Sequence, residues 1–209
     1  MKILIADDHA VVLEGLKQIL AKLPGVNHID EVTDGHEALK KIENNGYDFV
    51  ILDISLPGMS GLDVLKNLKM HDNQTPILIL SMHPEEQFAV RAYKLGVSGY
   101  ITKDRAGEEL LIAIKKISSG GKYVSPELAE YMALSLDERF EEFLHEKLSP
   151  REFQIMILFA KGRTSSEIAC ELFISEKTVG THRSRIMEKM GMKKISELIF
   201  YSIKNNLIE

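Results

Sequence analysis

The chain has 209 residues and a mass of 23.6 kDa, which is more than one typical domain and less than three. Apolar residues make up 44% and charged residues 27%, a balance that excludes disordered, collagen-like and low-complexity chains. The net charge is -5, the single cysteine excludes an internal disulfide framework, and no apolar run approaches the roughly 18 residues that span a bilayer. We therefore expect a cytoplasmic protein with two modest cores and no membrane partner.

Short apolar runs alternate with longer helical patterns over the first 120 residues, which predicts a parallel sheet covered on both faces by helices. The five runs are residues 2–7, 28–33, 48–53, 76–81 and 98–102. Four are nearly continuous in Ile, Leu and Val, as in strands buried on both faces, whereas 28–33 is polar at alternate positions and suits a sheet edge. Each gap fits one helix, so we predict an α/β, flavodoxin-like (βα)5 domain with strand order 2-1-3-4-5.

The chain changes character after this region. Residues 124–147 hold 2 basic and 7 acidic side chains, and Ser125-Pro126 opens a short helix. Capping boxes at Ser149 and Thr164 then begin helices, and four helices are predicted near 150–160, 165–172, 176–190 and 194–206. We predict an α/β domain over 1–120, an interdomain linker over 121–147 and a small all-α four-helix domain over 148–209.

Acidic residues follow two strands that are predicted to be neighbours. Asp7 and Asp8 close the first strand and Asp53 the third, so their carboxylates should converge where the strand order reverses. Such a cluster binds a proton or a cation, and hard oxygen ligands suit Mg2+ or Mn2+. Ser81 ends the fourth strand and Lys103 follows the fifth. Carboxylates, a metal, a hydroxyl and an ammonium group together suit a phosphoryl group.

These residues, with Tyr100, resemble the receiver domain of two-component response regulators over roughly residues 1–120. The resemblance implies that Asp53 accepts the phosphoryl group, and that Asp8, Asp53 and the Ser55 carbonyl bind Mg2+ while Asp7 acts through water. Lys103 would pair with the acyl phosphate. Ser81 and Tyr100 would form the switch pair, in which the hydroxyl moves to a phosphate oxygen and the aromatic ring turns inward to fill the space left behind. The family tunes hydrolysis at the position of His83, which could equally be an ordinary loop histidine. His9 has no partner at ligand spacing, so we assign it no zinc.

A basic stripe marks the predicted helix over 176–190. Residues 176–194 contain six basic and two acidic side chains, on the second of two amphipathic helices joined by a tight turn. That arrangement favours a helix-turn-helix with its second helix in the major groove of DNA. Motif residues from Leu148 to His182 make roughly residues 148–205 resemble the LuxR-type helix-turn-helix, with a recognition helix over 177–189. The whole chain resembles a NarL/FixJ-type regulator. By this resemblance the residues that face DNA are Lys177, Thr181, His182, Arg183, Ser184, Arg185 and Lys189.

Three further expectations concern the helical domain. Gly180 stands where many family members carry lysine, so direct base reading there is in doubt unless glycine permits closer approach. Cys170 is expected to be a small buried hydrophobe. The apolar residues Tyr201, Ile203 and Leu207 on the last helix could form a dimer face or close the core of their own domain.

We therefore expect a transcription regulator, not an enzyme, limited to autophosphorylation from small donors and slow autodephosphorylation. Its expected partners are a sensor histidine kinase, double-stranded DNA and a second copy of itself on phosphorylation or DNA binding, with RNA polymerase as a further candidate. One alternative is a phosphohydrolase that uses an aspartyl phosphate, although Asp7 and Asp8 are adjacent and do not form the Asp-x-Asp pattern of haloacid dehalogenase-like enzymes. Another is a receiver that never accepts phosphate.

Overall fold

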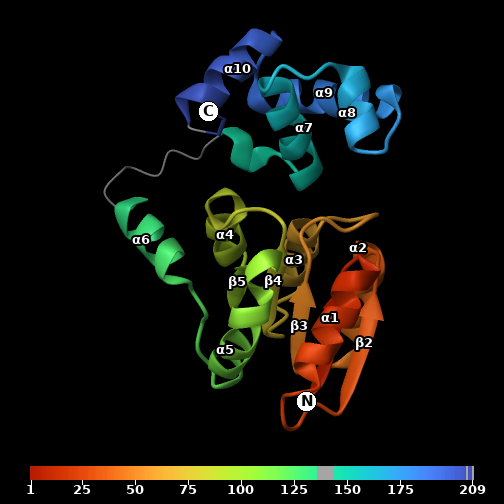
Figure 1. Cartoon of the computed structure of the whole chain (residues 1–209), viewed down its shortest axis with the longest axis vertical. Helices are drawn as coiled ribbons and strands as arrows, with labels where there is room; N and C mark the ends of the chain where they lie inside the picture. Colours follow the sequence, from red (N-terminus) through yellow and green to blue (C-terminus); the bar gives the residue numbers. More distant parts are fainter. Residues whose placement is uncertain (136–143, 206, 209) are drawn as a thin grey trace. The chain divides into compact units, whose positions relative to one another are not determined.

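A computed structural model describes residues 1–135, 144–205 and 207–208. The chain divides into two compact units, Met1–Phe140 and Glu141–Glu209, which we call the first and second unit and describe separately (Figure 1). In the part of the chain so described, no helix combines the length and the apolar character that crossing a bilayer requires. Residues 137–142, which hold four of the acidic side chains of the predicted linker, lie outside the described residues.

The first unit is built on five parallel strands. They are β1 (Lys2–Ala6), β2 (His28–Val32), β3 (Phe49–Leu52), β4 (Ile77–Ser81) and β5 (Gly99–Thr102). Their order is β2-β1-β3-β4-β5, which confirms the predicted topology. Strand β2 lies at the edge and only its last residue is buried, whereas β3 and β4 are buried throughout. The alternating polar pattern of β2 thus reflects a strand with one side toward solvent.

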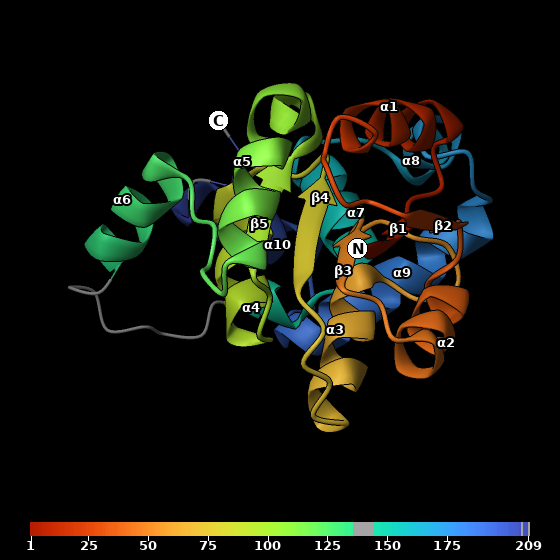
Figure 2. The same ribbon diagram turned by 90° about the horizontal axis from the view of Figure 1, so that it is seen from below.

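Five helices cover the two faces of this sheet. Helices α1 (Ala10–Leu20) and α5 (Ala106–Ser118) lie on one face, and α2 (Gly35–Asn45), α3 (Gly61–Met70) and α4 (Glu85–Lys94) lie on the other (Figure 2). A short 3-10 turn, Lys103–Arg105, connects β5 to α5. The core on the α1 and α5 face contains Ile and Leu side chains from the strands and from both helices. Burial of this apolar surface is the main stabilising contribution.

A further helix, α6 (Pro126–Ser135), follows within the predicted linker and confirms the expected start after Ser125. Tyr123, three residues before this helix, forms a parallel bridge with Gly99 of β5. The start of the linker region therefore packs on the first unit. The boundaries at 120 and 147 stay predictions.

The second unit is entirely helical among its described residues. After a 3-10 turn at Leu144–Lys147 come α7 (Pro150–Ala160), α8 (Ser165–Glu171), α9 (Glu176–Met190) and α10 (Ile195–Lys204). Both predicted capping boxes form, because Ser149 pairs with Glu152 and Thr164 with Glu167. The buried apolar side chains come from all four helices and include Phe153, Ile155, Met156, Ile168, Val179, Ile186 and Leu198. The four predicted helices agree with these bounds within one or two residues.

Two expectations for this unit meet different outcomes. The prediction that Cys170 is buried is wrong, because the thiol lies on the exposed side of α8 while Ile168 and Ala169 face the core. On α10, Tyr201 is half-buried and its hydroxyl lies 2.7 Å from His145 Nδ1, so Tyr201 helps to close the unit's own core. Ile203, by contrast, is 55% exposed. Leu207 is half-buried, and a dimer face on the last helix stays a prediction.

His145 gives the second unit a pH-dependent stability. Burial lowers the pKa of this imidazole to about 4, so the unfolded chain binds a proton between that value and about 6.5 while the folded chain does not. Because the pKa of His145 is lower in the folded chain than in the unfolded chain, the neutral imidazole contributes to the free energy of unfolding. This contribution is fully present above pH 6.5 and is lost as the pH falls toward 4. It amounts to up to about 3 kcal/mol.

His145→Gln should therefore weaken the fall in unfolding free energy between pH 7.5 and pH 4.5, measured by urea denaturation of the second unit's transition. His36→Gln, at an exposed histidine of the first unit, is the matched control and should leave the profile unchanged. Identical profiles for His145→Gln and the wild type would contradict the assignment.

Candidate functional site: an acidic cluster and a basic helix

Parallel pairing brings the three aspartates together. The residues after β1 and β3 are held side by side, because Asp53 N donates to Ala6 O at 2.8 Å. On the other side of β1, Asp7 N donates to Val32 O of β2 at 3.0 Å. Asp7 and Asp53 are both 1% exposed, whereas Asp8 faces solvent more. Gly61 at the start of α3 permits this close packing, since a Cβ there would lie 2.2 Å from the Asp53 carbonyl oxygen.

Lys103 bridges the two buried carboxylates. Its Nζ lies 2.7 Å from Asp53 Oδ2 and 2.7 Å from Asp7 Oδ2, and its side chain is 5% exposed. Burial by itself would lower the pKa of Lys103, but the two carboxylates outweigh it and the pKa is raised. The ammonium group is therefore charged and held at the predicted phosphoacceptor.

The cluster fits a divalent cation. Asp7, Asp8 and Asp53 carry three negative charges against one from Lys103, which leaves an excess of two. Asp7 Oδ2 makes only an ion-pair contact with Lys103, and no described residue gives it a hydrogen bond of good geometry. Ligand atoms of these aspartates and of His9 all lie within 4.8 Å of one another. Oxygen ligands with this charge suit Mg2+ or Mn2+.

His9 is the neighbour that the sequence analysis did not place in this cluster. Its Nδ1 lies 2.7 Å from Asp8 Oδ1 and 3.2 Å from Asp7 Oδ1. The contact arises because His9 follows the two aspartates directly and is the N-cap of α1. Spacing of metal ligands along a helix gives no signal for such a contact, whereas direct adjacency to Asp7-Asp8 could have given one.

The two predicted switch residues both bind the backbone of His83. His83 N donates to Ser81 Oγ at 3.1 Å, and Tyr100 Oη donates to His83 O at 2.9 Å. Ser81, the last residue of β4, and Tyr100, the second residue of the neighbouring strand β5, are fully buried, so the Tyr100 ring already lies inward. A movement of either hydroxyl must therefore disturb the loop between β4 and α4.

The His83 ring also reaches the acidic cluster. Its Nε2 lies 3.1 Å from Ser55 Oγ, and Ser55 N donates to Asp53 Oδ1 at 3.2 Å. Burial lowers the pKa of His83, Lys103 lowers it further, and Asp53 partly offsets both. His83 is thus half-buried and contacts Ser55 beside Asp53, while a role in tuning hydrolysis stays a prediction. The Ser55 carbonyl as a metal ligand stays a prediction.

The second candidate surface is α9. Ser175 caps the helix by accepting from Thr178 N, and Gly191 ends it in the left-handed conformation. Val179, Ile186 and Met190 face the core. The predicted DNA-facing residues Lys177, Thr181, Arg183, Ser184, Arg185 and Lys189 are exposed, whereas His182 is half-buried. The amphipathic helix therefore presents the basic stripe to solvent.

Some of these side chains already have partners within the unit. The hydroxyls of Thr181 and Ser184 donate to backbone carbonyls one turn earlier, at 3.0 and 3.2 Å. Lys189 Nζ lies 2.6 Å from Glu152 Oε2 on α7, and the Glu152 side chain is 4% exposed. Burial raises the pKa of Glu152, but Lys189 and the Ser149 amide outweigh it and the pKa is lowered. Lys189 thus joins α9 to α7, a role that the sequence did not indicate.

Gly180 leaves α9 open at one position, because a Cβ built there meets no described atom within 4 Å. Gly180→Ala should raise the free energy of unfolding by about 1 kcal/mol through helix propensity, measured by urea denaturation. Gly191→Ala is the control and should lower it, since Gly191 has φ +66°. A loss of stability in Gly180→Ala would show that this position is not open.

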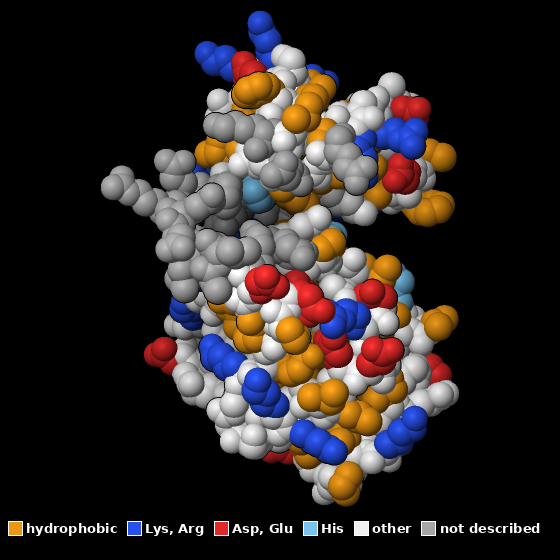
Figure 3. Space-filling model, turned by 60° about the vertical axis from the view of Figure 1, so that its left-hand side comes forward, with side chains coloured by type: hydrophobic (Ala, Val, Ile, Leu, Met, Phe, Trp, Pro, Cys, Tyr) orange, Lys and Arg blue, Asp and Glu red, His pale blue; other side chains and the backbone are white. Residues whose placement is uncertain are grey.

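Large hydrophobic side chains are exposed at separate places in both units. They are Val11, Met70, Met82, Ile112, Phe173, Phe200 and Ile203. Phe173, in the turn between α8 and α9, is 95% exposed and has φ 53°. Figure 3 shows one face of the molecule, on which hydrophobic side chains of the first unit lie among charged side chains of both signs. Scattered exposure of this kind is usual for protein surfaces.

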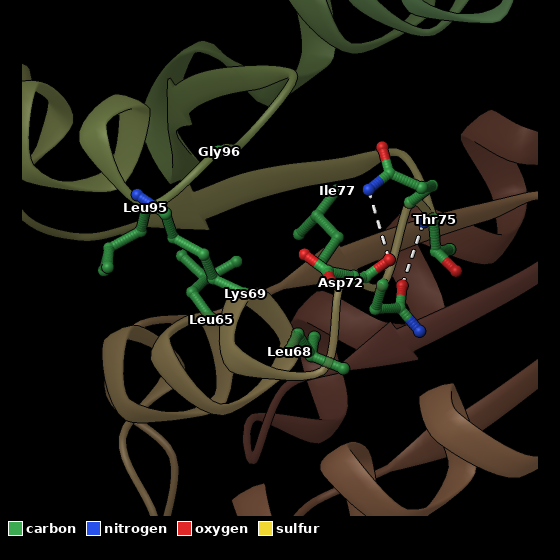
Figure 4. A pocket seen from close by; sticks show the side chains of 10 residues that line it. Leu65, Leu68, Lys69, Asp72, Thr75, Ile77, Leu95 and Gly96 are labelled. Carbon is green, nitrogen blue, oxygen red and sulfur yellow. Dashed lines mark hydrogen bonds between the residues drawn. The ribbon is translucent and has the colours of Figure 1, made fainter.

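A shallow pocket of about 270 Å³ lies at the opposite end of the sheet from the aspartates, between α3, the start of β4 and the end of α4 (Figure 4). Its polar groups bond to the protein itself. Gln74 Nε2 donates to Asp72 O, Thr75 N donates to Asn73 Oδ1, and Lys69 Nζ donates to Lys94 O. We assign no ligand to this pocket.

Comparisons with known proteins identify the families of both domains. Residues 3–115 match the response regulator receiver domain, and residues 146–202 match the LuxR family of bacterial regulatory proteins. The chain is 32% identical over 208 residues to the response regulator UvrY of Escherichia coli, covering 99% of this chain and 95% of UvrY. It is 38% identical over 216 residues to the oxygen regulatory protein NreC of Staphylococcus aureus, covering 100% of both.

Solved structures give the same result. The response regulator RcsB of Salmonella typhimurium has a TM-score of 0.60 at 27% identity, over 96% of this chain and 97% of RcsB. RcsB in complex with DNA has a TM-score of 0.59, again at 27% identity, over 96% of each chain. A receiver domain followed by a LuxR-type helix-turn-helix domain defines a transcription regulator of the response regulator class. The chain belongs to the NarL/FixJ family of two-component response regulators, with a LuxR-type DNA-binding domain.

Proposed function

We propose that this regulator is switched by phosphoryl transfer from a sensor histidine kinase to Asp53. The observation that carries the proposal is the pairing of Asp53 with Lys103 at 2.7 Å beside Asp7 and Asp8. In this reaction the phosphorus–nitrogen bond of a phosphohistidine breaks as an Asp53 oxygen bonds to phosphorus, and the histidine nitrogen leaves. The same pocket would accept a phosphoryl group from small donors and lose it slowly to water.

Mg2+ would be held by Asp8, Asp53 and the Ser55 carbonyl, with Asp7 acting through water. When bound, the ion neutralises charge on the phosphoryl oxygens during transfer. Lys103 holds its ammonium group at the acceptor carboxylate and would stay with the phosphoryl group. Ser81 would release the His83 amide to bind a phosphate oxygen, and Tyr100 would keep the neighbouring buried space filled.

For the second unit, we propose that α9 enters the major groove of double-stranded DNA. The support is its exposed basic stripe on a helix fixed by α7 and α8, and relatives such as RcsB are known in complex with DNA. Lys177 and Arg185 have exposed side chains that could contact phosphates or bases. The charge of Lys189 is partly neutralised by its ion pair with Glu152. The protein would act as a homodimer in the cytoplasm, with RNA polymerase as a further partner.

The test is selection of genomic fragments bound by the full chain, with and without acetyl phosphate and Mg2+. We expect phosphorylation to enrich one family of fragments, and the enrichment to disappear in Asp53→Asn. The same fragments bound equally under all conditions would leave DNA binding intact and contradict control by Asp53.

A further inference from the structure

The segment that leaves the receiver fold is fixed to β5 and α4. Tyr123 N donates to Ser98 O at 2.8 Å, and Tyr123 bridges to Gly99. Tyr93 of α4 donates its hydroxyl to the Tyr123 carbonyl. With 8% of its surface exposed, Tyr123 is an anchored point from which α6 begins three residues later.

Two residues after Tyr123, Ser125 connects the start of α6 to the start of α4. Its fully buried hydroxyl donates to Glu85 Oε2 and accepts from Leu128 N at 3.1 Å. Ser125 therefore caps α6 and at the same time binds the first residue of α4. Glu85 is itself 6% exposed, so a hydrogen bond from a hydroxyl to a carboxyl oxygen joins the starts of the two helices in a place largely closed to water.

Glu85 lies two residues after His83, whose backbone binds both Ser81 and Tyr100. The helix start has no side-chain cap of its own, because its N-cap is Pro84. Only Pro84 separates His83 from Glu85. A change in the hydrogen bonds of Ser81 and Tyr100 to His83 would therefore move Glu85, which binds Ser125. The path from the phosphoacceptor to α6 consists of contacts within the first unit alone.

We propose that the contact between Glu85 and Ser125 is a latch, which holds the start of α6 in the unphosphorylated protein and opens on phosphorylation. This proposal rests on the proposed switching by Asp53. Recruitment of the Ser81 hydroxyl by the phosphoryl group removes the acceptor of the His83 amide, and the start of α4 moves. Tyr123 stays bound to β5, so the change is delivered to α6 and to the chain that leads into the second unit.

The test is hydrogen exchange of the α6 amides around Leu128 in the full chain, with and without acetyl phosphate and Mg2+. Phosphorylation should speed this exchange about tenfold, the factor expected for loss of one buried hydrogen bond. Ser125→Ala and Glu85→Gln should each speed it without phosphorylation, and phosphorylation should then add little. Ser119→Ala removes an exposed serine hydroxyl at the end of α5 and is the matched control.

The two variants separate a latch from a simple cap. If only Ser125→Ala speeds exchange, Ser125 acts by capping α6 and the latch is wrong. The intact mass of each sample reports phosphorylation independently of α6. A fully phosphorylated wild type with unchanged exchange overturns the latch, whereas a protein that takes up no phosphoryl group contradicts the proposed function itself.

Discussion

Asp53→Asn should abolish the gain in mass of one phosphoryl group that acetyl phosphate and Mg2+ produce in the wild-type protein. The amide keeps the shape of the side chain and its place after β3, but it cannot form an acyl phosphate. Asp53 lies 2.7 Å from Lys103 Nζ and is buried to 1% exposure, so the environment that holds the phosphoryl group is already assembled. Intact-mass spectrometry after a fixed incubation measures the effect.

Asp8→Asn tests the metal in the same experiment. Asp8 is the most exposed of the three aspartates, and among the described residues it does not lie within ion-pair distance of Lys103. Its replacement should therefore lower Mg2+ affinity without disturbing the contact between Lys103 and Asp53. Labelling should then fall at low Mg2+ and recover in part at high Mg2+. Asp48→Asn, at an exposed aspartate before β3, is the control.

For the first of these two variants, equal labelling of Asp53→Asn and the wild type would contradict the assignment of Asp53 as the acceptor.

Much of this site follows from the sequence because parallel strands place their ends at one edge. Asp7 and Asp53 need only the strand order to be neighbours, and the polar pattern of residues 28–33 was enough to put the second strand at the edge. The sequence does not show that Lys103 bridges both carboxylates, since that depends on the turn after β5. Nor does it show that Ser81 and Tyr100 bind the same backbone residue.

The helical unit shows a different limit. Helical spacing predicts the four helices well, yet it does not show that Cys170 lies on the solvent side of α8. Charge counts find the basic stripe but treat every lysine as available to DNA. Only the packing of α9 on α7 shows that the Lys189 charge is paired with Glu152.

Lys189→Ala should therefore destabilise the second unit as well as weaken DNA binding. Removing the ammonium group leaves the Glu152 carboxylate at 4% exposure without its 2.6 Å partner. Loss of one partner of a buried ion pair costs about 3–5 kcal/mol, and since Lys189 is 40% exposed we expect about 1–3 kcal/mol. Urea denaturation measures this change. Arg185→Ala, at an exposed residue of the same helix, should leave stability nearly unchanged.

The salt dependence of DNA binding separates the two roles. Arg185→Ala should make the slope of log K against log salt less steep by about 0.9, the value for one phosphate contact. Lys189→Ala should change it by less, because part of its charge is already neutralised by Glu152. Glu152→Gln keeps the side-chain shape but frees the ammonium group, so the slope should become steeper. Two results together would contradict this role of the ion pair: unchanged stability of Lys189→Ala, and a salt slope of Glu152→Gln equal to that of the wild type. The pair would then constrain neither the fold nor the recognition helix.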